Sequence, residues 1–199
     1  MTHTMHRLSA ADDDFIIHVR PPKGRKEGTG PVLGDLLERL CACHPVNAGS
    51  PAAGTLLTKP LDTLIRTWPD GAPLHVVFDT EENLLAAVRL LDEANTGFSV
   101  SVCAPLGTVM RLEGQGHVHT MGYQMDLTPE EEEDWLSRLL SLCGHLRLST
   151  GNARRLCEEI RQGKCSAEEA ARELGRVCLC GCFNTTVAVR LLKEGSKES

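Results

Sequence analysis

The chain has 199 residues, of which 41% are hydrophobic, 24% charged and only 4% aromatic, with a formal net charge of -6. This is a globular composition, so it excludes an intrinsically disordered chain. The negative charge and the scarcity of aromatic side chains argue against nucleic acid as a partner, because its recognition relies on cationic and stacking side chains. The length suffices for one domain of ordinary size and a small second one.

Location and redox environment are inferred from the N-terminus, the hydropathy and the cysteines. Residues 1–14 are polar and acidic and lack the apolar core of a signal peptide. No apolar run approaches the roughly 20 residues that a membrane-spanning helix needs. We therefore expect a cytoplasmic protein without a membrane partner. The nine cysteines are an odd number, and in a reducing compartment clustered cysteines indicate metal binding or catalysis before disulfides.

The first 126 residues alternate between strand and helix patterns. The expected elements are, in chain order, a strand at 15–19, a loop at 21–31, a helix at 33–40, a loop at 44–55, a helix at 60–68, a strand at 74–78, a helix at 79–94, a strand at 98–102 and one or two further strands at 109–112 and 117–119. The strand, helix and strand over 74–102 predict a parallel crossover. Asp79, with Glu82 three residues later, is expected to cap its helix.

From Thr128 onward the pattern predicts helices only. They are expected from Thr128 to about Leu142, from Asn152 to Gln162, from Ser166 to Gly175 and from a cap at Asn184 onward. The first and third open with capping boxes at Thr128 and Ser166. We therefore expect an α+β protein, in which an N-terminal α/β domain with a small mixed or parallel sheet (1–126) precedes an all-helical, cysteine-rich metal or iron–sulfur domain (127–199).

The most informative segment places Cys178, Cys180 and Cys182 within five residues, just before the last helix. Thiolates packed this closely repel each other unless a cation, a cluster or a disulfide relieves the repulsion. In an extended segment residues two apart share a face, so the three sulfurs are expected to converge, and Gly181 permits a sharp turn between them. The positive end of the following helix favours thiolate over thiol. Soft thiolates select zinc, copper(I) or iron–sulfur clusters.

Cys143 and His145 are the best candidates for completing this site. They lie two residues apart at an expected helix end, where both side chains are able to ligate one centre. The five candidate ligands are thus Cys143, His145, Cys178, Cys180 and Cys182. A four-ligand centre leaves one of them over, which we expect to be Cys182.

These residues carry a resemblance to a known family. The segment from about 143 to 193 resembles the bacterioferritin-associated ferredoxin type of [2Fe-2S]-binding domain, which has a Cys-x-Cys, two short helices and a Cys-x-x-Cys before another helix. The matching positions here are Cys143-x-His145, Ile160 to Gly163, Ser166-x-Glu168-Glu169, Leu174-Gly175, the 178–182 cluster and Ala188-x-x-Leu191-Leu192. The chain departs from the family at His145 and in the Cys-x-Cys-x-Cys spacing. The resemblance implies a [2Fe-2S] module, and the departures leave zinc as the alternative.

Two weaker groups of candidate ligands lie in the N-terminal half. Cys41 and Cys43 end the expected helix at 33–40 and indicate a second metal site or a redox pair. His117 and His119 would share one face of a strand and, with Cys103 as a third ligand, would form a zinc or iron site. The latter group is the basis for an alternative reading as a metal-dependent enzyme.

The function expected from the sequence is that of a cytoplasmic iron–sulfur or related metal-binding protein in electron transfer or redox sensing. Its partner would be a redox protein or a small ligand, and a homodimer is left open. The alternatives are the metal-dependent enzyme, a carrier that hands metal or cluster on, and an oligomeric scaffold whose nine thiols are structural. The chain shows no complete acid–base or nucleophile set, so whether it is an enzyme stays undecided.

Overall fold

The structure is a computed structural model that describes residues 13–24, 26–112, 118–123, 134–143, 145 and 147–197. Within these residues the strands are β1 (Phe15–Arg20), β2 (Asn47–Ser50), β3 (Gly54–Thr55), β4 (Leu74–Phe78), β5 (Ser99–Pro105) and β6 (Val118–Tyr123). The helices are α1 (Thr29–Cys41), α2 (Leu61–Arg66), α3 (Glu81–Ala94), α4 (Leu106–Leu112), α6 (Trp135–Ser141), α7 (Thr150–Arg161), α8 (Ala167–Gly175) and α9 (Thr185–Gly195).

The strands form one mixed sheet in the order β3-β2-β4-β1-β5-β6. Strand β1 pairs antiparallel with both β4 and β5, whereas β5 and β6 run parallel. The expected α+β class with a mixed sheet is therefore confirmed. Strands β4 and β5 do run in the same direction, as the predicted crossover requires, but β1 lies between them, so α3 connects strands that are not neighbours.

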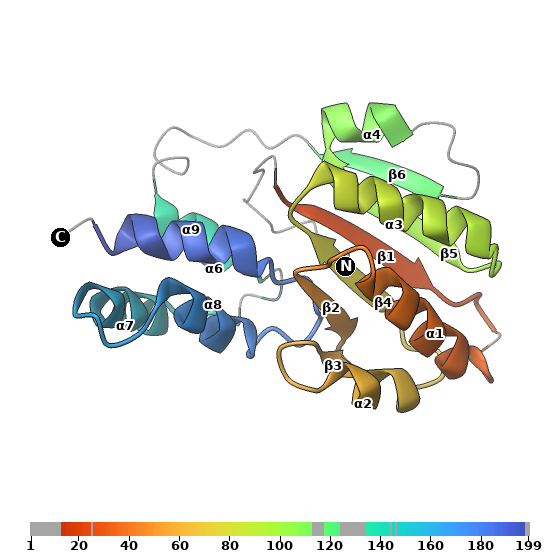
Figure 1. The fold of residues 1–199 in the computed structure, drawn as a ribbon, viewed down its shortest axis with the longest axis horizontal. Coiled ribbons are helices and arrows are strands. Elements are labelled where there is room, and N and C mark those ends of the chain that lie inside the picture. Colours follow the sequence, from red (N-terminus) through yellow and green to blue (C-terminus); the bar gives the residue numbers. More distant parts are fainter. Residues whose placement is uncertain are drawn as a thin grey trace.

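The two faces of the sheet belong to two different hydrophobic cores. On β1, Phe15, Ile17 and Val19 pack into the first core, with α1 and α3, because alternate residues of a strand point to opposite faces. Ile16, with Val77 of β4, packs instead into a second core made mostly by the C-terminal helices. In Figure 1, α1 and α3 lie over the sheet while α6 to α9 gather as a second group beside it. The second core thus joins the sheet to the helical group.

Two segments of the N-terminal half differ from their predicted structure. Residues 44–55, expected to be a loop, contain β2 and β3, whose small side chains give little strand signal in the sequence. Residues 109–112, expected to be a strand, belong to α4, because a short apolar run has no period that separates helix from strand. The cap of α3 is also one residue later than predicted, since the Thr80 hydroxyl accepts the Asn83 N–H and Asp79 instead accepts a hydrogen bond from Thr186.

The helical half follows its capping signals where it is described. Ser166 and Glu169 form the predicted capping box of α8, and the Asn184 side chain caps α9. The predicted start at Thr128 and the domain boundary near 126 lie outside the described residues. Asp134 is extended and caps α6, so the helix that ends near Leu142 begins at Trp135. None of the helices within the described part of the chain has both the length and the apolar character needed to cross a membrane.

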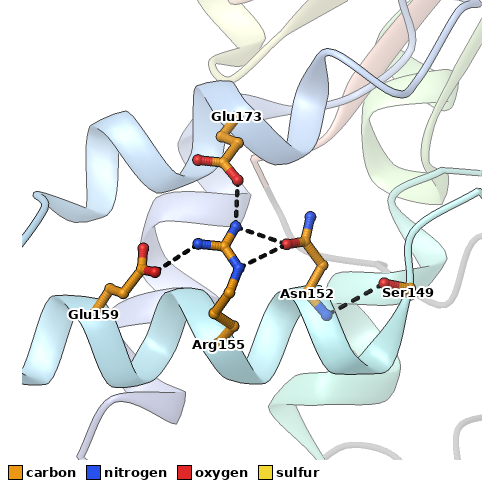
Figure 2. A network of polar contacts seen from close by, with 5 residues as sticks. All are labelled: Ser149, Asn152, Arg155, Glu159 and Glu173. Carbon is orange, nitrogen blue, oxygen red and sulfur yellow. Dashed lines mark hydrogen bonds and ion pairs between the residues drawn. The ribbon is translucent and has the colours of Figure 1, made fainter.

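A polar network fixes α7 against α8 on the outer side of the helical group. Arg155 of α7 forms ion pairs with Glu159 of its own helix and with Glu173 of α8, and it also donates to the Asn152 side chain (Figure 2). The Asn152 backbone N–H in turn donates to Ser149, the N-cap of α7. Because these groups are exposed, the ion pairs contribute little to the free energy of unfolding, but they link α7 to α8.

Candidate metal centre

The loop between α8 and α9 alternates between buried cysteines and exposed apolar residues. Cys178, Cys180 and Cys182 are at most 1% exposed, whereas Val177 and Leu179 are each 40% exposed. The alternation places the three sulfurs on the inner side of the loop, as the two-residue spacing predicts. The site of the cysteines therefore lies directly beneath a small apolar surface.

Hydrogen bonds from the sheet hold this loop in place. The Nδ1 atom of His75 on β4 lies 2.8 Å from the backbone oxygen of Cys180, and the Asn47 side chain of β2 donates to the backbone oxygen of Phe183 at 3.2 Å. These donors are 105 and 136 residues away from their acceptors along the chain. The loop is thus fixed by the sheet rather than by the helices that flank it in sequence.

Glycine allows the loop and the sheet to approach at backbone distance. Gly181 has a φ of 80°, and a Cβ atom added to it would lie 2.4 Å from the backbone nitrogen of Gly49 and 2.8 Å from the carbonyl carbon of Ala48. A side chain at position 181 would therefore both strain the backbone and push the loop off β2. The sequence signal for Gly181 as a turn between cysteines is confirmed, and its partner is the glycine of the unexpected strand β2.

Four cysteines form a continuous row in the second core. The sulfur atoms of Cys178 and Cys180 lie 3.2 Å apart. Side-chain hydrogen bonds extend the row from Cys178 to Cys143, at the end of α6, and from Cys180 to Cys182. We call Cys143, Cys178, Cys180 and Cys182 the thiol row. The structure thus brings together four of the five principal candidate ligands.

Contacts within the row and burial favour the protonated form of Cys143, Cys178 and Cys180. The hydrogen bond with Cys178, together with burial, raises the pKa of Cys143 far above its usual range, although the Arg147 and His145 backbone N–H groups oppose the shift. The bond to Cys143 lowers the pKa of Cys178, but the contact with Cys180 and burial outweigh it and raise that pKa to about 12. The pKa of Cys180 is lowered by Cys178 but raised more by Cys182 and burial. At Cys178 and Cys180, burial and the neighbouring thiols therefore outweigh the expected thiolate-favouring effect of the α9 terminus.

Two histidines on the sheet lie beside the end of this row. His18 of β1 and His75 of β4 are direct cross-strand partners, 0% and 4% exposed, with ring centroids 4.9 Å apart and ring planes at 78°. One nitrogen of each ring and the sulfur of Cys182 all lie within 4.8 Å of one another. Within the described residues this is the one group of three or more potential metal ligands that meets this criterion. Cys182, expected to be the spare cysteine, is thus the one that meets the histidines.

The hydrogen bond of His75 fixes which ring nitrogen is available to a ligand. A carbonyl oxygen only accepts, so Nδ1 of His75 carries the hydrogen and donates it to Cys180. Burial lowers the pKa of His75 and keeps the ring neutral, so Nε2 is the nitrogen without a hydrogen. Metal-bound histidines usually have this arrangement, in which one nitrogen ligates while the other donates to a carbonyl or carboxylate.

The remaining candidate ligands lie apart from this centre. The side chain of His145 is exposed, although its backbone contacts the Cys143 sulfur. Cys103 is buried in the second core, whereas His119 on β6 is exposed and lines a surface hollow beside Ser99. His117 lies outside the described residues. With one of its three members outside the described residues, the group of His117, His119 and Cys103 stays a prediction, and the structure shows only that His119 is exposed while Cys103 is buried.

The pair at the end of α1 gains no additional ligand within the described residues. Cys41 is half-buried and Cys43 is buried, both as free thiols. Burial, with repulsion from Cys43 and Glu38, raises the pKa of Cys41, and burial alone raises that of Cys43. Both side chains pack in or against the first core, whereas the thiol row lies in the second core.

His18 and His75 are the site residues that the sequence analysis missed. Each is a single imidazole within an otherwise apolar strand, in Phe15 to Val19 and in Leu74 to Phe78. A polar side chain inside a buried strand requires a partner, and this requirement could have identified both histidines as candidate site residues. What the sequence does not reveal is that the two strands pair in the register that places these rings together.

The donor set suits the cofactor that the family resemblance implies. Four buried thiols from two segments match the ligand number and chemistry of a [2Fe-2S] cluster, for which Cys143, Cys178, Cys180 and Cys182 would be the ligands. The side chain of His145, at the position of a family cysteine, is exposed, whereas the four thiols are buried. Comparisons with protein-family models, with curated proteins and with solved structures found no match.

The close contact of the loop with β2 makes Gly181 a critical position. Gly181→Ala should lower the free energy of unfolding by about 1–2 kcal/mol through its positive φ and by a further ~1–3 kcal/mol through the contact with Gly49. Urea unfolding measures the loss. Gly163→Ala is the matched control, because Gly163 also has a positive φ but nothing within 4 Å of an added Cβ. Equal losses in the two variants would contradict the close approach.

The buried neutral His75 should make the metal-free protein less stable in mild acid. Its pKa is lowered from 6.5 in the folded state, so its contribution is fully present above that pH and is lost as the pH falls and the unfolded chain takes up the proton first. His75→Asn should flatten this dependence by up to about 1.4 kcal/mol per pH unit. Urea unfolding at several pH values tests it, and His119→Gln, which changes an exposed ring, should leave the profile as it is.

Proposed function

We propose that this protein binds a thiolate-ligated metal centre in the thiol row, an iron–sulfur cluster of the [2Fe-2S] type, and uses it in electron transfer or redox sensing. The observation that carries the proposal is the convergence of four buried thiols from two segments of the chain. The cluster would supply one-electron redox chemistry when bound. The chain's own residues would hold it, exclude water from it and connect it to the surface.

Packing alone is a poor explanation for the thiol row. Cysteine does occur as a small buried residue, but apolar packing does not require a row of four, in which the sulfurs of Cys178 and Cys180 lie 3.2 Å apart. A disulfide between Cys178 and Cys180 would close a strained ring across one residue, and none of the described cysteines forms a disulfide. A soft cation explains the same arrangement directly, because it exchanges for the thiol protons and links the sulfurs.

The position of the row under the surface supports a protein redox partner. Val177 and Leu179 flank Cys178 along the chain and expose apolar side chains over the buried sulfurs. Arg176, just before them, is also exposed. Transient redox complexes use small interfaces, and a compact apolar patch beside a charge suits one. A partner docked there would approach the centre without the loop having to open.

Zinc is the alternative occupant of the same ligands. Four thiolates also form a tetrahedral zinc site, which would make the centre structural and not redox-active. The raised pKa values of the cysteines do not separate the two metals, since either one must displace the thiol protons. Iron with inorganic sulfide in anaerobically purified protein would favour the cluster, and one zinc ion in colourless protein would favour the structural site.

Single serine variants test the thiol row as the ligand set. Cys178→Ser and Cys180→Ser should each lose most of the bound metal, because each removes a soft donor from the middle of the row. Cys157→Ser is the matched control, since Cys157 is also buried in the same core but its sulfur lies near the Leu192 carbonyl instead of the row. Metal and sulfide per chain, measured after anaerobic purification, give the result.

The proposal would fail if all three variants kept the same metal content. It would also fail if the unaltered protein, isolated without oxygen, contained neither iron nor zinc in amounts near one ion per chain. Circular dichroism of each variant shows whether metal loss follows from lost ligands or from lost fold.

A further inference from the structure

The paired imidazoles on the sheet are not explained by a site made of thiols alone. His18 and His75 are nearly inaccessible to solvent and lie next to each other on the face of the sheet that packs against the second core. Removing two imidazoles from water is costly, because each carries polar nitrogens that water would otherwise solvate. The Nδ1 atom of His75 holds the loop through its hydrogen bond with Cys180, and both rings lie close to the sulfur of Cys182.

We infer that His18, His75 and Cys182 form a binding site for one copper(I) ion at the sheet end of the thiol row. Their donor atoms all lie within 4.8 Å of one another. Metal–ligand bonds of about 2.0–2.3 Å place donors on one ion roughly 3.3–3.8 Å apart, so inward movements of about 1 Å complete the site. The three donors come from β1, β4 and the loop, which are already fixed against each other.

The donor types and their charge select the ion. A thiolate with two imidazoles excludes hard ions such as Mg²⁺ and Ca²⁺, and soft thiolate ligands favour copper(I). On binding, the Cys182 thiol gives up its proton and forms the sulfur–copper bond, while both imidazoles remain neutral. One thiolate and one Cu⁺ cancel, so the complex carries no net charge. A Zn²⁺ ion in the same place would leave a buried positive charge without a counter-ion among these ligands, which is costly.

The hydrogen bond that docks the loop also prepares His75 as a ligand. Its donation to the Cys180 carbonyl sets the tautomer and the ring orientation, as outer partners of metal-bound histidines do. Because Cys182 is only two residues after Cys180, the same hydrogen bond also restricts the position of Cys182. The site is therefore preorganised, and the ion would link the sheet to the helical group.

This inference is related to the proposed function through Cys182, which belongs to both ligand sets and whose thiolate is able to bridge two metals. The experiment therefore starts from Cys143→Ser/Cys178→Ser, in which the thiol row is broken but the inferred site is intact. Titration of this variant with Cu⁺ under anaerobic conditions, in competition with a coloured copper(I) chelator, gives the number of ions bound and their affinity.

We expect this starting variant to bind one Cu⁺ per chain. Adding His75→Asn should weaken binding by more than about 100-fold, because loss of a ligand costs more than loss of an outer partner. Asparagine keeps an N–H near the position of Nδ1, so the loop is able to stay docked while the imidazole is removed. Adding Cys182→Ser should have the same effect. Adding His119→Gln or Cys157→Ser should change nothing.

The two proposals fail in different ways. If the starting variant binds no Cu⁺, or if His75→Asn binds it as tightly, the copper site is refuted, while iron in the unaltered protein still supports the proposed function. If the unaltered protein takes up no iron or zinc but the starting variant binds Cu⁺, the copper site stands alone. X-ray absorption of the Cu⁺-loaded starting variant gives a test free of further substitution: a shell of two nitrogens and one sulfur is expected, and an all-sulfur shell would overturn the assignment.

Discussion

The hydrogen bond from His75 to the backbone of Cys180 is the contact on which the centre depends. It joins a ring on a central strand to a loop 105 residues later, and it acts where Gly181 lets the two backbones meet. The Asn47 amide adds a second tie three residues further along the loop, at Phe183. Without these contacts the cysteines would lie on a turn between two helices, with no fixed relation to the sheet. With them, sulfurs and imidazoles share one buried volume.

The sheet makes this arrangement possible because its two faces pack into two different hydrophobic cores. One face, with Phe15 and Ile17, completes a conventional core under α1 and α3. The opposite face carries Ile16 and His18, which alternate along β1, and Cys103, which pairs with Ile16 from β5. The loop before α9 packs against that face and brings the cysteines to it. Any ion bound there would therefore crosslink the N-terminal and C-terminal parts and stabilise the folded chain against the unfolded one, since the unfolded chain lacks the assembled ligands.

The sequence was most informative where chemistry is local. The spacing of Cys178, Cys180 and Cys182 and the capping residues Ser166 and Asn184 act within a few positions, and they were identified from the chain alone. Whether those thiols hold a cluster stays a prediction. Strand β2 was missed because its Ala-Gly-Ser residues have little strand propensity. These small residues allow the close approach of the Gly181 backbone, which becomes visible only in the folded structure.

The histidines were missed for a different physical reason. Their meeting depends on long-range strand register, in which His18 lies opposite His75, and nothing local in either strand specifies that pairing. The same limit applies to His145. Its position two residues from Cys143 made it a reasonable ligand, but the chain turns after α6 so that its side chain is exposed while its backbone N–H reaches the sulfur. Spacing along the chain therefore identified which residue types gather, but not which side chains face inward.

The most direct test of a buried metal centre between sheet and loop is anomalous diffraction from a crystal of protein purified and grown without oxygen. The account predicts a metal peak among the sulfurs of the thiol row, next to the imidazoles of His18 and His75. A peak confined to Cys41 and Cys43, or clear density for the row with its sulfurs turned apart and no metal between them, would contradict it.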